Sequence, residues 1–242
     1  MITSAANPRL KLVRKLKAKR QREQLGLFVC EGEDLVGAAL DAGLVPVESL
    51  VDAERPALRD RLDGAEEVEP KLLAAVSSLA HPPRVVAVFR RADLPRLDPA
   101  AAPRVGLALW RVSDPGNVGT LVRSADAFGP AFVALSAGSA DPTSVKALRA
   151  SAGAVFRVPG GRFEDAPRPW IGLVPGTRST LAELSPGTRA TFVLGAEREG
   201  LPGGVAARCD AVVSIPHTGG AESLNVAVAG SIALYEWGRR RG

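Results

Sequence analysis

The chain has 242 residues, 46% of them hydrophobic but only 5% aromatic, so it is long enough for one large domain or two modest ones with aliphatic cores. Its formal net charge of +5 favours a polyanionic partner, although a merely soluble basic protein is the alternative. Two cysteines are too few for a disulfide framework, and two histidines are too few for a histidine-based metal site. No apolar run is long enough to span a membrane. We therefore expect a cytoplasmic protein without metal.

The first predicted element is a basic helix. Asn7 is typical of a helix N-cap, and Pro8 is typical of the first helical position. The helix is expected to run through Arg22, with one narrow apolar stripe and an otherwise cationic surface. We predict phosphate contacts for part of that surface and for one later arginine: Arg14, Lys15, Lys17, Lys19, Arg20 and Arg149. The alternative is a solvated charged face.

Between residues 27 and 90, strands and helices are predicted to alternate in the order β-α-β-α-β. The strands are expected at 27–30, 45–51 and 84–89, and the helices at 31–43 and 71–79. This order predicts a small α/β domain over residues 1–92. The next segment, 93–103, is rich in Pro, Asp and Ala and is predicted to be a linker.

A second α/β domain is predicted over residues 104–242. Its strands are expected at 105–110, 131–135, 154–158, 170–174, 191–194 and 212–215, and its helices at 118–128, 141–151 and 223–237. Strands that are separated by helices predict a mostly parallel sheet with helices on both faces.

Three polar, glycine-containing loops follow strands of this second domain. They are Asp114–Gly119, Gly195–Gly200 and the segment after residue 215, which carries Glu222, Ser223 and Asn225. Because ligands of open α/β sheets bind beyond the carboxyl ends of the strands, we expect the three loops to form one composite site.

Each polar side chain also has a purely structural alternative. Asn117, Ser223 and Asn225 are residue types typical of helix N-caps, and Glu197 is equally suited to holding a turn together. Arg123, on the helix after the first loop, is either a surface cation or a phosphate clamp.

Several common α/β enzymes are excluded by missing motifs. No G-x-G-x-x-G follows a strand, and no G-x-S-x-G is present. The glycines of Gly195–Gly200 have P-loop spacing, but Leu201 and Pro202 follow instead of Lys and Ser or Thr.

In this order, the three loops resemble the motifs of the SpoU/TrmH family of RNA ribose 2′-O-methyltransferases, within the SPOUT superfamily. Asp114–Gly129 resembles the first motif, Phe192–Gly200 the second and Ile215–Ala227 the third. The resemblance covers residues 104–242. Residues 1–92 resemble, less specifically, the L30e-like RNA substrate-binding domain that many members carry.

The resemblance implies S-adenosyl-L-methionine as the methyl donor, a C-terminal trefoil knot and a homodimer. It implies donor binding by four residues: Leu194, Gly195, Ile215 and Leu224. It implies catalytic roles for five more: Asn117, Arg123, Glu197, Ser223 and Asn225. Two positions depart from the family pattern, since His217 stands where Met is usual and Ala227 where Ser is common.

The expected function is therefore methyl transfer to a ribose 2′-hydroxyl of RNA, with 23S ribosomal RNA favoured as substrate. Because arginine stays protonated in proteins, we expect Arg123 to stabilise the developing alkoxide rather than to remove the proton. The alternatives are a transfer-RNA 2′-O-methyltransferase and a catalytically silent RNA-binding or ribosome-assembly factor. An enzyme that methylates a small molecule or a protein fits the basic N-terminal helix poorly.

Overall fold

The computed structural model describes residues 1–185, 187–217, 219 and 223–240, and it divides the chain into two compact units. Unit 1 comprises residues 1–94 and 141–156, and unit 2 comprises residues 95–140 and 157–242. The expected functional division into 1–92, 93–103 and 104–242 stays a prediction. The compact units differ from it mainly at 141–156, which packs with the N-terminal unit.

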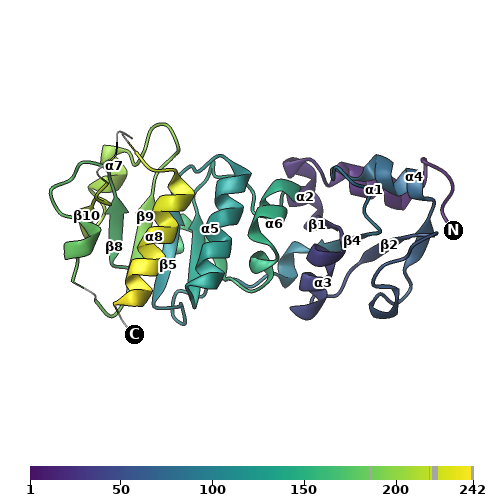
Figure 1. Cartoon of the computed structure of the whole chain (residues 1–242), viewed down its shortest axis with the longest axis horizontal. Helices are drawn as coiled ribbons and strands as arrows, with labels where there is room; N and C mark the ends of the chain where they lie inside the picture. The colour runs from purple at the N-terminus through teal and green to yellow at the C-terminus, as the bar shows by residue number, and fades with distance from the viewer. Residues whose placement is uncertain (186, 218, 220–222, 241–242) are drawn as a thin grey trace. The chain divides into compact units, whose positions relative to one another are not determined.

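Unit 1 is built around a four-stranded sheet with the order β1-β4-β2-β3 (Figure 1). The strands are β1 (Leu27–Glu31), β2 (Glu48–Asp52), β3 (Glu66–Val68) and β4 (Val85–Arg90). β4 runs antiparallel to β1 and β2, whereas β2 and β3 are parallel. The sequence did not predict β3, because it has three residues of which two are glutamates, a residue type depleted in strands.

The helices of unit 1 are α1 (Pro8–Lys15), α2 (Lys19–Leu25), α3 (Glu33–Asp41), α4 (Pro70–Val76) and α6 (Val145–Ser151). The predicted cap is confirmed, because the Asn7 side chain accepts a hydrogen bond from the Arg9 backbone N at 2.9 Å. The prediction of one continuous basic helix is wrong, since the chain turns between α1 and α2. Arg22 is buried and donates to the carbonyl oxygens of Leu16 and Lys17, so it does not belong to a basic face.

The strand predicted at 154–158 is also wrong. Ala154–Phe156 forms a turn of 3-10 helix, η3, and all three residues are buried. Phe156 stacks on Phe28, with ring centroids 6.3 Å apart. A short apolar run indicates burial, but its periodicity does not distinguish a strand from a helical turn.

Unit 2 contains a six-stranded sheet in which every pairing is parallel, with the order β10-β8-β9-β5-β6-β7. The strands are β5 (Val105–Leu109), β6 (Ala131–Leu135), β7 (Gly160–Arg162), β8 (Trp170–Leu173), β9 (Ala190–Leu194) and β10 (Ala211–Val213). Leu109 is in register with Leu135 on one side and with Leu194 on the other, so three carboxyl ends lie at one edge.

Helices cover both faces of this sheet, as predicted. On one face, α5 (Pro115–Ala127) and α8 (Val226–Arg239) lie side by side in front of β5 and β9 (Figure 1). They approach closely at Gly230, where an added Cβ would lie 2.4 Å from Leu121. The other face is covered by η4 (Phe163–Asp165) and the short α7 (Gly203–Ala206), whose Phe163 and Val205 belong to one apolar cluster.

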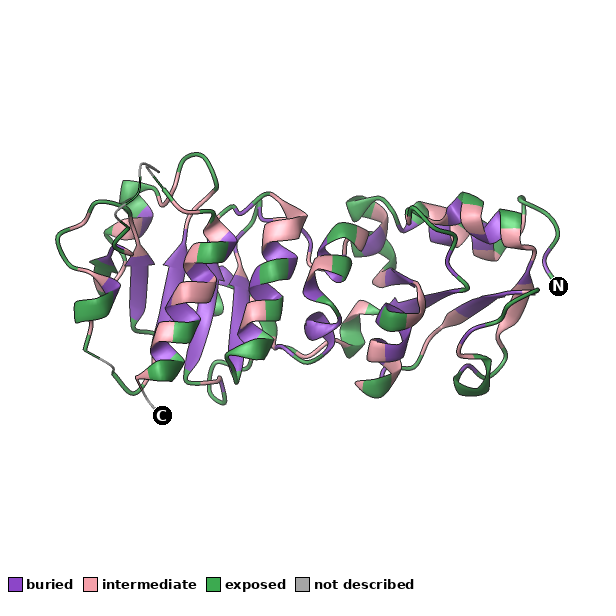
Figure 2. Ribbon diagram, viewed as in Figure 1, coloured by how far each residue is buried: buried purple, intermediate pink, exposed green. Residues whose placement is uncertain are grey.

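Burial follows these layers. The central strands of the sheet are buried, while the outer faces of α5 and α8 are exposed (Figure 2). In the part of the chain that the structure describes, no helix combines the length and apolarity that a membrane crossing requires.

Candidate active site

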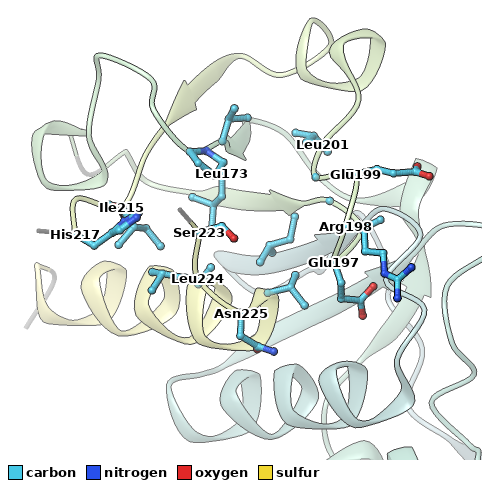
Figure 3. Close-up of a pocket in the computed structure, with 18 residues that line it drawn as sticks. Leu173, Glu197, Arg198, Glu199, Leu201, Ile215, His217, Ser223, Leu224 and Asn225 are labelled. Carbon is cyan, nitrogen blue, oxygen red and sulfur yellow. Dashed lines mark hydrogen bonds between the residues drawn. The ribbon is translucent and has the colours of Figure 1, made fainter. Parts of the chain in front are cut away.

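A cavity of about 490 Å³, here called the main pocket, lies at the carboxyl edge of the unit 2 sheet (Figure 3). Its walls come from the ends of β8 and β9, from the loop 195–201, and from the segment before α8. All four residues predicted to bind the donor line it: Leu194, Gly195, Ile215 and Leu224. Three of the five predicted catalytic residues line it as well: Glu197, Ser223 and Asn225.

The third loop leads directly into α8. Figure 3 shows Ser223, Leu224 and Asn225 in succession before the helix, with Glu197 on the opposite wall. Asn225 caps α8, because its Oδ1 accepts from the backbone N of Ala227 at 2.8 Å and of Val228 at 3.3 Å. The alternative that Ser223 is the cap is therefore wrong. Glu222 lies outside the described residues.

Asn117, in the first loop, is not the N-cap of α5. Asp114 caps α5, with its Oδ1 accepting from the Asn117 backbone N at 3.0 Å. The Asn117 side chain is consequently available for contacts with the other two loops. Its Nδ2 donates to Glu197 Oε1 at 3.1 Å, and its Oδ1 accepts from Asn225 Nδ2 at 3.2 Å. One amide thus links all three loops.

Glu197 joins the first and second loops. Besides Asn117, its carboxylate accepts from the Ser113 backbone N at 3.2 Å, the Ser113 hydroxyl at 3.3 Å and the Asp114 backbone N at 3.0 Å. Partial burial acts to raise the pKa of Glu197, but the hydrogen bonds from Asn117, Asp114 and Ser113 outweigh it and hold that pKa below its ordinary value. The ionised carboxylate therefore fastens the two loops together.

The second loop requires glycine for its closure. Gly195 approaches the opposite side of the loop so closely that an added Cβ would lie 2.0 Å from the carbonyl carbon of Gly200. Gly200 has a left-handed backbone, with φ +65°, and its N donates to Ala196 O at 2.9 Å. This tight turn follows the end of β9 and lines the main pocket.

The structure does not bring every predicted residue to the pocket. Arg123 is exposed on α5, outside the residues that line the main pocket, and its side chain has no hydrogen bond or salt bridge to the described residues. The six predicted RNA contacts all belong to unit 1. Of these, Arg14 donates to Ala5 O at 2.8 Å and Lys17 to Ser77 O at 3.2 Å.

Sequence reasoning missed one wall of the main pocket. Leu173, Val174 and Pro175 line it from the end of β8. The signal was available, because β8 was predicted and the carboxyl ends of parallel strands share an edge. The residues that line the pocket here are apolar, so this segment was not assigned to the site.

The chemistry of the main pocket suits a small, partly apolar ligand. Its volume falls within the range of about 300–1,000 Å³ that is common for such sites. Leu194, Ile215 and Leu224 provide apolar walls, while the hydrogen-bonded rim at Glu197 and Asn225 is polar. The arrangement is able to hold a ligand at a fixed distance from a second reactant outside the rim.

Comparison with known proteins places the chain among RNA methyltransferases. Residues 104–235 match the model of the SpoU rRNA methylase family, and residues 7–87 match the MRM3-like substrate binding domain. An uncharacterized tRNA/rRNA methyltransferase of Synechocystis is 34% identical, with 99% of this chain and 94% of the relative covered. The 23S rRNA (guanosine(2553)-2′-O)-methyltransferase RlmP of Bacillus subtilis is 32% identical, with 97% of each chain covered.

Solved structures agree over nearly the whole chain. An AdoMet-bound rRNA methyltransferase from Sinorhizobium meliloti superposes with a TM-score of 0.86 at 30% identity, covering 99% of this chain and 97% of the other. The SpoU methyltransferase AviRb from Streptomyces viridochromogenes, in complex with AdoMet, gives a TM-score of 0.83 at 26% identity, with 97% and 98% covered.

Proposed function

The chain belongs to the SpoU rRNA methylase family, and from this premise we propose that it transfers a methyl group from S-adenosyl-L-methionine to a ribose 2′-hydroxyl of RNA. The observation that carries the proposal is the hydrogen-bonded chain from Glu197 through Asn117 to Asn225. It fixes three loops around one pocket, so that a donor inside and a sugar outside meet in a set geometry.

The main pocket fits the donor. When bound, S-adenosyl-L-methionine supplies an electrophilic methyl group on a sulfonium. We assign its binding to Leu194, Gly195, Ile215 and Leu224, which line the pocket and combine apolar side chains with main-chain polar groups. The ionised Glu197 at the rim favours a positively charged ligand there.

The acceptor side needs a group that orients the 2′-hydroxyl and a group that stabilises the negative charge developing on its oxygen. Ser223 suits the first role, because its exposed hydroxyl lines the main pocket and has no hydrogen bond to the described part of the chain. Arg123 suits the second role, since its guanidinium stays protonated and is exposed on α5. Asn117 acts as a positioning residue, because both ends of its amide are engaged.

Large-subunit ribosomal RNA is the substrate that we propose. The Bacillus subtilis relative is named for such an RNA, and the match to a substrate-binding domain coincides with the basic residues of unit 1. Residues 1–92 would then bind RNA and residues 104–242 would carry out the transfer. The cytoplasm is the location that we propose, because a bacterial protein like the Bacillus subtilis relative meets ribosomal RNA there.

We further propose a homodimer, while the C-terminal trefoil knot stays a prediction from the family resemblance. Three large apolar side chains are exposed on the face that α5 and α8 form: Phe128, Val228 and Tyr235. The rings of Phe128 and Tyr235 touch edge to face, with centroids 5.8 Å apart. An apolar patch on two adjacent helices favours burial against a second copy of the same surface.

Methyl-labelled donor tests the function directly. The purified protein is incubated with unmodified transcripts of large-subunit ribosomal RNA or of transfer RNA in separate reactions, and the RNA is digested to nucleosides. We expect label in a 2′-O-methylated nucleoside from the ribosomal transcript. Label only in transfer RNA would support the tRNA alternative, and RNA binding without any transfer would support the silent RNA-binding factor.

A further inference from the structure

Arg111 has a backbone conformation that its side chain disfavours. It follows β5 and has φ +53°, in the left-handed region that glycine adopts without steric penalty. Among the described residues of unit 2, it is the only non-glycine residue with a positive φ. The Ser136 hydroxyl holds this conformation by accepting from the Arg111 backbone N at 2.8 Å. Backbone strain of this kind concentrates at functional sites, so the side chain needs an explanation.

The Arg111 side chain lines a second cavity of about 370 Å³, here called the Arg111 pocket. Its stem lies over Gly138, where an added Cβ would be 3.6 Å from Arg111 Cγ and Nε. Segment 196–199 forms one wall of this cavity and also a wall of the main pocket. Figure 3 shows Arg198, on this shared segment, beside Glu197. The two cavities therefore adjoin across the loop that Glu197 fastens.

Two of the three carboxylates that line the Arg111 pocket are engaged within the fold, whereas its two guanidiniums are not. Glu197 accepts hydrogen bonds from Ser113, Asp114 and Asn117, and Asp114 caps α5. Neither Arg111 nor Arg198 forms a salt bridge with any described residue. The exposed carboxylate of Glu199 also lines the cavity and opposes an anion there.

We propose that Arg111 and Arg198 bind a phosphodiester of the RNA strand that carries the target ribose. The proposal rests on the proposed function, and it assigns the Arg111 pocket to the strand next to the methylated nucleotide. A guanidinium matches phosphate oxygens with two parallel N–H donors, which a Lys or an uncharged side chain does not provide. The donor's own carboxylate is the competing anion, but a donor held by Leu194, Gly195 and Ile215 occupies the other side of segment 196–199.

Arg111→Gly tests the proposal because it should lower RNA affinity without lowering the stability of the fold. Glycine adopts φ +53° freely, so the melting temperature should stay equal or rise. Affinity for a large-subunit ribosomal RNA transcript should fall about tenfold, and the slope of log affinity against log salt should decrease by about one. Affinity for S-adenosyl-L-methionine should not change. Arg198→Ala should lower RNA affinity and the salt slope in the same way, and Glu199→Gln should strengthen RNA binding. Because both residues also line the main pocket, donor affinity is compared for Arg111→Gly alone.

Arg104→Ala is the matched control, because Arg104 precedes β5 at the opposite end of the strand and is exposed. It should retain the wild-type salt slope. Wild-type RNA affinity and slope in both Arg111→Gly and Arg198→Ala would overturn the proposal, as would a loss confined to donor affinity. A wild-type protein that binds RNA but transfers no methyl group would contradict the proposed function instead, and the binding measurements would still decide the role of the Arg111 pocket.

Discussion

The Arg22 guanidinium lies 2.8 Å from the Asp141 carboxylate, and the two residues are only 3% and 6% exposed. Arg22 also donates to two carbonyl oxygens at the turn between α1 and α2, while Asp141 also accepts from Arg91 at 3.1 Å and from Thr143. This ion pair therefore holds the basic N-terminal helices to segment 141–156 inside unit 1.

Removing one charge of this pair should destabilise the protein strongly. Asp141→Asn leaves the Arg22 guanidinium buried without a counter-charge, and the free energy of unfolding should fall by about 3–5 kcal/mol. The control is Asp41→Asn, since the pair of Asp41 with Arg61 is exposed and contributes about 0–1 kcal/mol. Urea denaturation measures both variants. If Asp141→Asn and Asp41→Asn lost the same free energy of unfolding, burial would not increase the contribution of the ion pair between Arg22 and Asp141.

The same pair predicts a dependence of stability on pH. Burial raises the pKa of Asp141, but hydrogen bonds from Thr143 and the charges of Arg91 and Arg22 outweigh it, so the pKa lies below its ordinary value. A carboxyl whose pKa is lowered by folding stabilises the protein above its unfolded pKa of about 4, and this contribution is lost as the pH falls through the folded pKa. Asp141→Asn should show a shallower loss of stability below about pH 4.

Much of the site was predictable from sequence because its signals are local. The strands that end at Leu109, Leu194 and Val213 are short apolar runs, and a polar loop comes after each of them. The cap of α5 was considered at Asn117, three residues after the actual cap Asp114, and the cap of α8 was left open between Ser223 and Asn225. Which member of each pair caps the helix depends on contacts with another loop.

The parts that were not predicted depend on distant partners. Arg22 looked like one more cation on a basic helix, and its burial is explained by Asp141, 119 residues further along the chain. Likewise, Arg111 gave no signal, because its positive φ depends on the turn around Ser136. A single sequence gives the local pattern of charge and hydrophobicity but not which distant group meets it.

Neutralising the basic surface of unit 1 should weaken RNA binding without affecting the donor. Lys15, Lys17, Lys19 and Arg20 are all exposed. If each contacts a phosphate, replacing all four by Gln should reduce the slope of log affinity against log salt by about 3–4. Filter binding over a range of salt concentrations measures this. As a control, Gln at Arg59, Arg61 and Lys71 removes cations elsewhere in unit 1, and an equal effect there would argue against a specific surface.

Glu197→Gln should loosen the link between the first and second loops. The carboxylate accepts four hydrogen bonds, whereas an amide offers one acceptor oxygen and places an NH₂ against donors such as the Asp114 backbone N. We expect kcat to fall by about 10²-fold because the rim is no longer held in position. Glu164→Gln, an exposed glutamate of unit 2 that lines neither cavity, is the control. Single-turnover methyl transfer measures the chemical step for both.

Arg123→Ala should abolish most methyl transfer while donor affinity stays at the wild-type value. Arg123 lies outside the main pocket, so the donor does not need it, whereas charge developing on the ribose oxygen does. The expected loss is about 10²–10³-fold in kcat. Calorimetry with S-adenosyl-L-methionine provides the second readout, and a parallel loss of donor affinity would contradict the assigned role. Arg123→Lys should restore only part of the rate, because an ammonium keeps the charge but not the planar fork.

Gly195→Ala should disrupt the main pocket through backbone geometry alone. The new Cβ would lie 2.0 Å from Gly200 C and 2.2 Å from Leu201 N, both main-chain atoms that cannot rotate away, so the turn 195–200 must open. Donor affinity should fall at least about tenfold and transfer should be lost with it. Gly204→Ala in α7 is the control, because nothing lies within 4 Å of its added Cβ and alanine favours a helix. It should bind the donor as the wild type does. Normal donor binding by Gly195→Ala would mean that the closed turn is not what shapes the pocket, and the donor would then be held by the walls that β8 and the segment before α8 provide.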